Sequence, residues 1–581
     1  MFNNITFTLV TCTFFMAIVG WISYRMTKGE VDTKDGYFLG GRGLTGIFIA
    51  GSMVLTNLSA EQLIGLNGSA FGYDMSSMAW EVTAGFAIIV CGLIFIPKYL
   101  MGAFSTLPEF LKDRFGDNVR RISVILFLIG YGVITIPSVL YAGALAVLKL
   151  FDVPALLNLS YYQSLVVTIF VIGVIGAIYA IFGGLKAVTV SDTLNGVGLL
   201  IIGVLVPILA IRYLGNGSFL GGLTEMVSTH TEKLNAIGGA KSPTPFGTLF
   251  TGMIFANLFY WGTNQYVIQR ALGAKNLAEG QKGVLWSGFF KLLVPLFMMI
   301  PGIIAFHLYR DSGLKSIDLA YPVLVNTVLP KFMSGFFLAV LLGAVFSSFN
   351  SLLNSAATMF CLDVYIPLRK KEISDTHLIN VAKLSSIIIA AFSFIVAPLL
   401  AFAPEGLFQI IRIFTGFYNI PIIAVVLVGL FTKRVPGIAA VITIIFHVLV
   451  YGLYRFAIDI PLHFIHIYGI LFVIEVAIML IIGKFYPRKT AWHFKVDPKV
   501  DMTPWKYAYP TASTLFSGII ICYLLFSPVG LVNGIGFQFF IYTLLILVLD
   551  VIFSVIAVKR WNTKYGKNQN NSNNKPAIGI V

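Results

Sequence analysis

Long apolar stretches recur along the whole 581-residue chain, and most are about as long as a membrane-spanning helix. About 20 apolar residues, rising about 1.5 Å each, cross a hydrocarbon core of roughly 30 Å. The pattern predicts about fifteen spans, with starts near residues 5, 44, 77, 121, 160, 188, 246, 283, 332, 380, 406, 436, 461, 511 and 533. We therefore expect an all-α polytopic membrane protein with about 14–15 transmembrane helices and no sizeable soluble domain.

Two of these apolar stretches are interrupted by polar residues and glycines near their centres. The second contains NLSAEQ at residues 57–62, and the seventh contains FANLFYWGTNQ at residues 255–265. Their starts are five spans apart, and an odd repeat length places two copies in opposite orientations. Matching interrupted helices in two halves are typical of an inverted-repeat transporter, because each break frees backbone groups to bind solute and ion.

The composition supports this interpretation. Hydrophobic residues make up 57% of the chain and charged residues 11%, whereas a soluble domain has roughly a quarter charged residues. The net charge of +15 does not indicate nucleic-acid binding, because Lys and Arg are scattered over short loops. Cys12, Cys91, Cys361 and Cys522 lie in apolar stretches without CxxC spacing, so we interpret them as small core residues.

The distribution of Lys and Arg predicts the orientation in the cell membrane. Alternate loops are rich in cations, such as RKK at 369–371 and KR at 433–434, and the intervening loops, including 212–244, contain few. Because cations stay on the cytoplasmic side, the N-terminus is expected outside and the C-terminus inside. The first span lacks the flanks of a cleaved signal and is expected to be retained. The polar, low-complexity tail at 561–581 is expected to be disordered.

Four charged residues, Glu61, Glu81, Lys291 and Arg412, lie well inside apolar stretches. Each costs at least a few kcal/mol if it faces lipid, so each is expected to face a partner or a cavity. In one interpretation, Glu61 or Glu81 pairs with Lys291 and holds two helices together. In the other, the charges belong to a polar cavity for a hydroxylated solute, since donors, acceptors and aromatic faces accompany them: Asn57, Gln62, Asn257, Tyr260, Trp261, Asn264 and Gln265.

Two adjacent serines, Ser347 and Ser348, occur in the ninth span within LLGAVFSSFNSLLNSAATMF. A serine in a membrane helix usually bonds back to its own backbone. Next to an unwound helix, however, two hydroxyls and the freed carbonyls supply the several oxygens that a small hard cation needs. This arrangement favours sodium.

Five motifs carry a resemblance to a known family: SMVLTNLSAEQLIG, IFGGLKAVTVSD, ANLFYWGTNQYVIQR, GFFKLLVPLFMMIPGI and GAVFSSFNSLLNSAATMF. They resemble the sodium:solute symporter family, especially its sugar-transporting members, and run in the same order from about residue 35 to 430. The resemblance implies a LeuT-type core of two inverted five-helix repeats at 44–431. An extra helix and loop at 1–43 would precede it, and additional helices at 432–560 would follow.

The resemblance also implies site residues, with Na⁺ as the cotransported ion and no organic cofactor. Sodium would be bound by the carbonyls and hydroxyls of Leu55, Leu58, Ala344, Ser347 and Ser348. Hydrogen bonds to a sugar would come from Gln62, Glu81, Asn257 and Lys291. Asn57 would link the two sites, and Tyr260, beside Trp261, would be the gate. Asp192 matches an acid on the ion exit path, although a plain helix-end acid fits the sequence equally well.

Arg412 departs from the family pattern, because the sugar transporters have a glutamine that touches the solute at this position. An arginine cannot accept a hydrogen bond, and its permanent charge prefers a carboxylate, sulfate or phosphate. Either Glu61 or Glu81 neutralises Arg412 and the solute is a neutral sugar, or Arg412 binds an anionic solute such as a uronate, a sialic acid or a sulfated sugar. Gln409, one turn earlier, is a candidate for the missing contact.

We therefore expect a sodium-coupled symporter that imports a sugar by alternating access, in a lipid bilayer and without nucleic-acid partners. The family resemblance implies a monomer. The sequence contains no G-x-x-x-x-G-K-[ST] phosphate-binding loop, so it gives no indication of ATP use. An integral-membrane enzyme is a weak rival, because no HExxH or GxSxG lies on a span and the histidines fall mostly near span ends. A passive channel or a transporter-like sensor is the third possibility.

Overall fold

The computed structural model describes residues 2–27, 33–151, 153–314, 316–369, 373–402, 407–458, 460–494 and 500–566. Within these ranges the chain is helical almost throughout, and the only isolated bridge joins Leu44 to Ala274. The prediction of an all-α protein is therefore confirmed. The last helix continues through a short π-helical turn, Asn562–Gly566, so the expected tail begins in a helix, and its remainder lies outside the described residues.

Twelve helical segments of the described chain are long and apolar enough to cross a membrane, and a bent helix pair makes a thirteenth. The helices that build the spans are α1 (Phe2–Thr27), α3 (Gly46–Asn57), α4 (Ala60–Gly72), α5 (Ala79–Val82), α6 (Ala84–Val90), α7 (Ile96–Met101), α9 (Asp117–Ile129), α10 (Ile136–Phe151), α12 (Tyr161–Leu214), α14 (Met253–Gly262), α15 (Gln265–Leu272), α16 (Leu277–Met298), α17 (Ile300–Tyr309), α19 (Ser334–Met359), α21 (Asp375–Val396), α22 (Leu407–Phe431), α23 (Gly437–Phe456), α24 (Phe464–Phe485), α25 (Ala508–Leu525) and α26 (Phe537–Trp561). Shorter helices between them are α2 (Lys34–Leu39), α8 (Leu107–Phe115), α11 (Val153–Leu157), α13 (Phe219–Ser228), α18 (Ala320–Val328) and α20 (Ile366–Leu368). The described chain thus has 12–13 candidate spans, fewer than the 14–15 predicted. The other two predicted positions are occupied by the shorter apolar segment Tyr161–Ala177 and by the interrupted pair α14 and α15.

Helix α12 contains two of the predicted spans, which correspond to its apolar segments Tyr161–Ala177 and Leu185–Leu214. Both segments pack against α19. Gly176, in the first, lies against Phe346, and Asn195, in the second, lies against Gly343 one turn away. Ile175 and Ser191 also line one small cavity together with Ser347.

Both interrupted stretches are broken helices, as the sequence predicts. Helices α3 and α4 meet at Leu58 and Ser59 with a bend of 57°. Helix α14 ends where the backbone N–H groups of Thr263 and Asn264 both turn back to the carbonyl of Phe259, and α15 begins after Asn264. Each break leaves backbone groups without the partners of a continuous helix.

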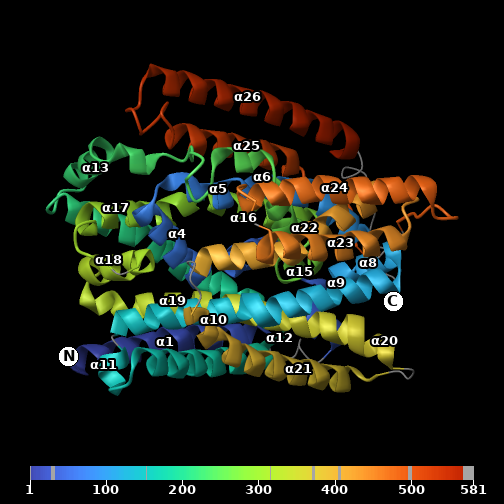
Figure 1. Ribbon diagram of the computed structural model, residues 1–581, viewed down its shortest axis with the longest axis horizontal. Helices are drawn as coiled ribbons and strands as arrows, with labels where there is room; N and C mark the ends of the chain where they lie inside the picture. Colours follow the sequence, from blue (N-terminus) through green and yellow to red (C-terminus); the bar gives the residue numbers. More distant parts are fainter. Residues whose placement is uncertain are drawn as a thin grey trace, which may run out of the picture.

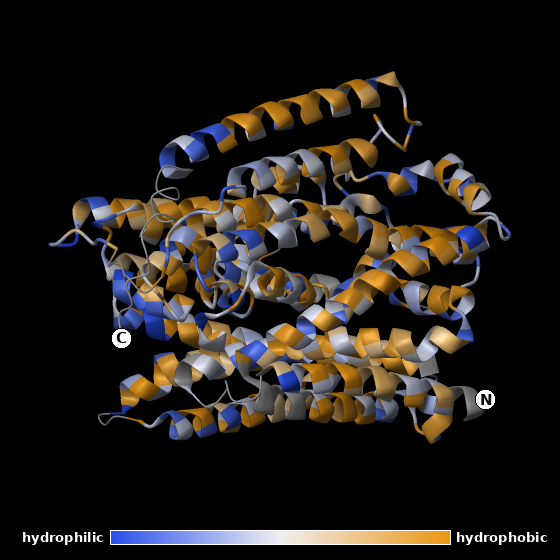
Figure 2. Ribbon diagram, turned by 180° about the vertical axis from the view of Figure 1, so that it is seen from behind, coloured by the Kyte–Doolittle hydropathy of each residue, from blue (hydrophilic) through white to orange (hydrophobic). Residues whose placement is uncertain are grey.

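The helices lie roughly along the long axis of the molecule, with α26 at one edge and α1 and α21 at the opposite edge (Figure 1). The start of α1 and helix α13 are at one end, whereas α8 and α20 are at the other. The helix bodies are mainly hydrophobic, and hydrophilic residues gather at the helix ends, most densely near α8 and α9 (Figure 2). The broken helices, α16 and α22 lie between the two edges, where they are covered by other helices.

Helix α4, the second half of the first broken helix, is held by a close approach to α17. A Cβ atom at Gly302 would lie 2.1 Å from the carbonyl oxygen of Asn67. We expect Gly302→Ala to push the two helices apart and to destabilise the protein by about 1–3 kcal/mol. Thermal unfolding in detergent should show a melting temperature lower by several degrees.

Gly196 provides a matched control, because it also lies in a helix but a Cβ there would meet no atom within 4 Å. Gly196→Ala should leave the melting temperature unchanged or raise it slightly, since alanine favours a helix by up to about 1 kcal/mol over glycine. If Gly302→Ala melts at the wild-type temperature, α4 and α17 do not depend on this contact.

Candidate functional site

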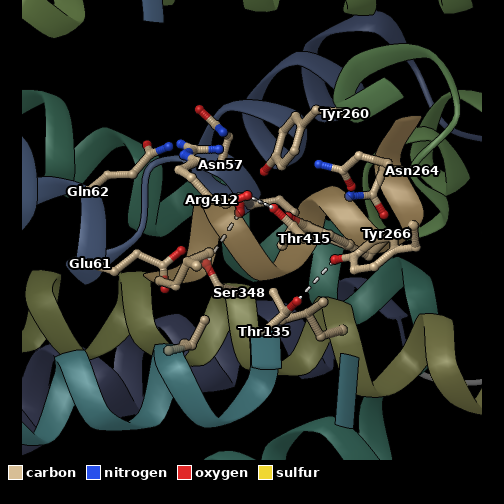
Figure 3. Close-up of a pocket in the computed structure, with 16 residues that line it drawn as sticks. Asn57, Glu61, Gln62, Thr135, Tyr260, Asn264, Tyr266, Ser348, Arg412 and Thr415 are labelled. Atoms are coloured by element: carbon tan, nitrogen blue, oxygen red, sulfur yellow. Dashed lines mark hydrogen bonds between the residues drawn. The ribbon is translucent and has the colours of Figure 1, made fainter. Parts of the chain in front are cut away.

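A polar cavity lies at the break between α3 and α4 (Figure 3). Helices α10, α14, α15, α19 and α22 complete its wall. The residues that line it are Thr56, Asn57, Glu61, Gln62, Thr135, Val139, Tyr260, Asn264, Tyr266, Ser348, Leu352, Ile411, Arg412, Thr415, Tyr418 and Asn419. Most of these side chains are polar or aromatic, which suits a small polar ligand.

Of the residues predicted to bind sodium, Ser348 lines this cavity, whereas Ser347 lines the small separate cavity with Ile175 and Ser191. The break removes the usual partner of the Leu55 carbonyl, because the Ser59 N–H donates to Asn57 instead. On α19, Ser348 donates to the Thr56 carbonyl at 3.3 Å, and Ser347 and Ala344 precede it on the same buried helix. The five predicted ion ligands therefore lie in two places: Leu55 and Leu58 at the break between α3 and α4, and Ala344, Ser347 and Ser348 on α19.

Asp192 is fully buried within α12 and lies beside Ser347. Its Oδ2 accepts a hydrogen bond from Ser52 at 2.7 Å and lies 3.8 Å from Nη2 of the buried Arg270. The sequence alone also allowed a plain helix-end acid; in the structure Asp192 lies within the continuous helix α12 and is buried. Its carboxyl charge is balanced by an arginine next to the predicted ion ligands.

A second polar cluster surrounds an ion pair between Lys291 Nζ and Glu81 Oε2, both almost completely buried. Gln62 donates to Glu81 Oε1 at 3.2 Å, and the Lys291 ammonium lies 5.4 Å from the centre of the Trp261 ring. Asn257, also predicted to bind solute, donates to Thr83 at 3.1 Å. Of these residues only Gln62 also lines the cavity, so it connects the two polar regions.

Tyr260, the predicted gate, lies on the cavity wall and packs edge-on against Trp261, with 5.4 Å between ring centres. Its hydroxyl interacts with the side chains of Asn57 and Tyr266. The tyrosine therefore separates the Lys291 cluster, which contains Trp261, from the part of the cavity lined by Tyr266.

Arg412 lines the cavity from α22 and stacks over the Trp80 ring at 4.6 Å. Glu61 lies within electrostatic reach of the guanidinium, whereas Glu81 is engaged by Lys291. Of the two carboxylates considered from the sequence, Glu61 is thus the one beside Arg412. The side chain of Gln409, the other candidate on α22, lies outside the described residues.

Four acceptor oxygens that belong to cavity-lining residues are buried and accept no hydrogen bond from the described residues: Asn57 Oδ1, Glu61 Oε2, Gln62 Oε1 and Asn419 Oδ1. A buried acceptor without a donor costs about 1–3 kcal/mol. The cavity therefore favours a ligand that brings several O–H or N–H donors.

Part of the cavity wall consists of residues that were not predicted from the sequence. Thr415 and Asn419 follow Arg412 at helical spacing on α22, and Thr135 and Tyr418 share a 3.4 Å contact across the cavity. The spacing of 412, 415 and 419 was a usable signal, because it marks one polar stripe on an apolar helix. Thr135 had no comparable signal, since its span reads as uniformly apolar.

A bundle of membrane-length helices, in which two broken helices enclose a polar cavity, is the architecture of a secondary transporter. Comparison with known proteins gives the family. The profile of the sodium:solute symporter family matches residues 37–446. The chain belongs to the sodium:solute symporter family. It is a sodium-coupled transporter and not an enzyme.

Individual relatives agree with this assignment. The "Uncharacterized symporter YidK" of Escherichia coli is 42% identical over 499 residues, which cover 86% of this chain and 87% of the relative. The sodium/glucose cotransporter of Vibrio parahaemolyticus is 31% identical, with coverage of 73% and 80%. A solved Na⁺-coupled sialic acid symporter in a substrate-bound outward-open state superposes with a TM-score of 0.72 at 22% identity, over 84% of this chain and 99% of that chain. The expected LeuT-type fold is confirmed.

Proposed function

We propose that this symporter couples Na⁺ entry to uptake of a neutral sugar or a similar polyhydroxylated solute. The four unpaired acceptor oxygens around the cavity carry this proposal, because sugar hydroxyls are donors that would satisfy them. An anion without hydroxyl groups brings acceptors only and would leave them unpaired. The hydroxyls of an acidic sugar would also satisfy these oxygens, so the choice between the two sugar classes rests on the charges near the cavity.

The charges near the cavity also support a neutral solute. Lys291 is paired with Glu81, Arg270 lies beside Asp192, and Glu61 is close to Arg412. These six groups balance, so an anionic solute would add a charge without a dedicated counter-charge. In this proposal Arg412 donates hydrogen bonds to the sugar, and the Glu61 carboxylate balances the positive charge of Arg412.

Sodium would bind at the helix break, through the Leu55, Leu58 and Ala344 carbonyls and the Ser347 and Ser348 hydroxyls. Asn57 would join the ion and solute sites, and Asp192 would receive the ion as it leaves. Gln62, Glu81, Asn257 and Lys291 would contact the sugar when the helices close, with Tyr260 and Trp261 as the gate. These roles follow the family resemblance and the proximity of the groups.

Ion binding would stabilise the outward-open core, and solute binding would let it rock inward. One sodium charge gains roughly 2.3 kcal/mol at about 100 mV. A tenfold sodium gradient adds about 1.4 kcal/mol, and the sum supports an accumulation of several hundredfold.

We also propose that the N-terminus is outside, the C-terminus cytoplasmic and the working unit a monomer. The expected outside parts, the N-terminus and the loop containing α13, lie at the end of the molecule opposite α8, which carries Lys112 and Arg114, and α20, which precedes RKK at 369–371 in the sequence (Figure 1). The same proposal assigns residues 44–431 to the transport core, with 1–43 and 432–560 as added segments.

The relatives transport two different kinds of solute. The alternative to a neutral sugar is therefore an anionic sugar whose charged group binds Arg412. The Vibrio relative is a glucose cotransporter, whereas the solved structure is of a sialic acid symporter. Arg412 lines the cavity in a position where an acidic sugar would reach it.

Uptake by proteoliposomes under an imposed Na⁺ gradient tests the two solute classes. Galactose and glucose should accumulate, and glucuronate and sialic acid should not. Arg412→Gln should keep neutral-sugar uptake, with KM changed by less than about tenfold, because glutamine still donates. Uptake of an acidic sugar by the wild type, lost in Arg412→Gln, would establish the alternative. Uptake that persists without a Na⁺ gradient would indicate a channel, and binding without uptake would indicate a sensor.

A further inference from the structure

A buried histidine and a buried glutamate meet on two helices outside the proposed transport core. His447 lies on α23 and Glu475 on α24, and both side chains are completely buried. His447 Nδ1 is 2.5 Å from Glu475 Oε1, and His447 Nε2 is 3.0 Å from the Gly416 carbonyl oxygen on α22. Neither residue lines the cavity.

The two contacts of the His447 ring indicate where the pair holds its protons. A carbonyl oxygen only accepts, so Nε2 must carry a hydrogen and donate it to Gly416. Two bare acceptors repel at hydrogen-bond distance, so the contact between Nδ1 and Oε1 implies another proton between them. Whichever atom carries that proton, the pair has no net charge.

The second carboxyl oxygen of Glu475 supports the same conclusion. Oε2 is buried and accepts no hydrogen bond from the described residues. An ionised carboxylate facing the Nδ1 lone pair, with its other oxygen unsolvated, would be strongly unfavourable. Loss of the shared proton therefore creates an uncompensated charge inside the membrane domain.

The pair acts on the helix that carries the cavity wall. Beside the bond from His447 to Gly416, Tyr451 donates to the Ile413 carbonyl at 2.9 Å and Tyr468 donates to the Arg412 carbonyl at 2.5 Å. Helices α23 and α24 thus grip one turn of α22, and that turn contains the cavity residues Arg412 and Thr415. The grip is tight, because a Cβ at Gly416 would lie 2.3 Å from the Tyr468 hydroxyl.

We propose that His447 and Glu475 form a buried proton-binding site, and that the shared proton holds the Arg412–Gly416 turn of α22 against α23 and α24. Deprotonation breaks the contact between Glu475 and His447 and releases this turn. Solute affinity then falls as pH rises through the deprotonation of the pair.

The titratable groups near the pair come from α22, α23 and α24. Tyr451 on α23 stacks on the His447 ring at 5.5 Å, and Tyr468 lies on α24. Arg412 is the charged residue of α22 at this turn, and its charge acts on Tyr468. Helix α14 faces α24 with Phe255, which stacks on Phe472 at 3.6 Å. Arg114 of α8 donates to the Val435 carbonyl next to the start of α23, about ten residues from His447, and Phe115 packs against Gly437 there.

The test uses a reporter that needs no solute. Thr415→Cys places a thiol on the gripped turn, and its rate of labelling by N-ethylmaleimide is measured in proteoliposomes from about pH 6 to about pH 10. The same reporter is measured in Glu475→Gln, whose amide donates to Nδ1 but cannot ionise. At each pH, the labelling rate with Glu475 is divided by the rate with Glu475→Gln, which cancels the titration of the reporter thiol itself. Labelling of the protein without Thr415→Cys is subtracted to correct for the four native cysteines.

We expect the ratio of the labelling rates to rise at least about fivefold toward alkaline pH as the turn is released. Tyr451→Phe, which removes a hydroxyl from the grip but leaves the pair, should retain this rise. A ratio that stays flat over the whole range would overturn the proposal. So would loss of the rise in Tyr451→Phe, because the titrating group would then be the phenol. The measurement is independent of the solute, so it fails or succeeds separately from the proposed sugar.

Discussion

Glu81→Ala is expected to destabilise the protein by about 3–5 kcal/mol and to abolish uptake, because it leaves the buried Lys291 ammonium without its counter-charge. The two side chains form a buried ion pair, and Gln62 also donates to Glu81. Thermal unfolding in detergent and Na⁺-driven sugar uptake in proteoliposomes measure the two effects.

The double variant Glu81→Gln/Lys291→Met separates folding from transport. It removes both charges together, so most of the lost stability should return. If the pair also contacts the sugar, uptake stays absent in this folded variant. Normal uptake by the double variant would show that the pair only holds α5 and α16 together, which is the structural role that the sequence left open.

Ser347→Ala/Ser348→Ala is expected to raise the Na⁺ concentration for half-maximal uptake about a hundredfold. Each hydroxyl removed from a cation costs on the order of 1.4 kcal/mol, which is a factor of ten. Ser348 already donates to the freed Thr56 carbonyl at the helix break, and Ser347 is on the same buried face of α19. Initial uptake rates at varied external Na⁺ provide the measurement.

Ser385 and Ser386 on α21 are a matched control for this pair. They are also adjacent and buried, but both donate to the Ala382 carbonyl of their own helix. Ser385→Ala/Ser386→Ala should leave the sodium dependence unchanged. If the Ser347/Ser348 double variant also shows unchanged dependence, sodium binds elsewhere.

Most of the fold follows from patterns that are local in the sequence. The fifteen spans were predicted because lipid exposure requires about 20 apolar residues wherever they occur. The two broken helices were predicted because polar residues at 57–62 and 255–265 are expensive inside a membrane unless they serve a site. Both signals depend on residue type along the chain and not on distant partners.

Partner choice was not available from the sequence. Glu61 and Glu81 were equivalent candidates for two cations, and only the packing of α5 on α16 pairs Glu81 with Lys291 and leaves Glu61 near Arg412. The Glu475 carboxyl was missed because it is a single polar residue in an apolar helix, and its partner His447 is 28 positions away. The expectation that histidines lie mostly near span ends does not describe His447, which is buried inside α23.

The sequence by itself determined the membrane class, the positions of most spans, the family and the two helix breaks, because hydrophobic length and motif spacing act over a few turns of one helix. Only the tertiary structure decided which charges neutralise one another, which acceptor oxygens remain unpaired around the cavity, and which helices grip α22. These features depend on contacts between residues that are far apart in the chain, and burial makes each contact or missing partner energetically decisive.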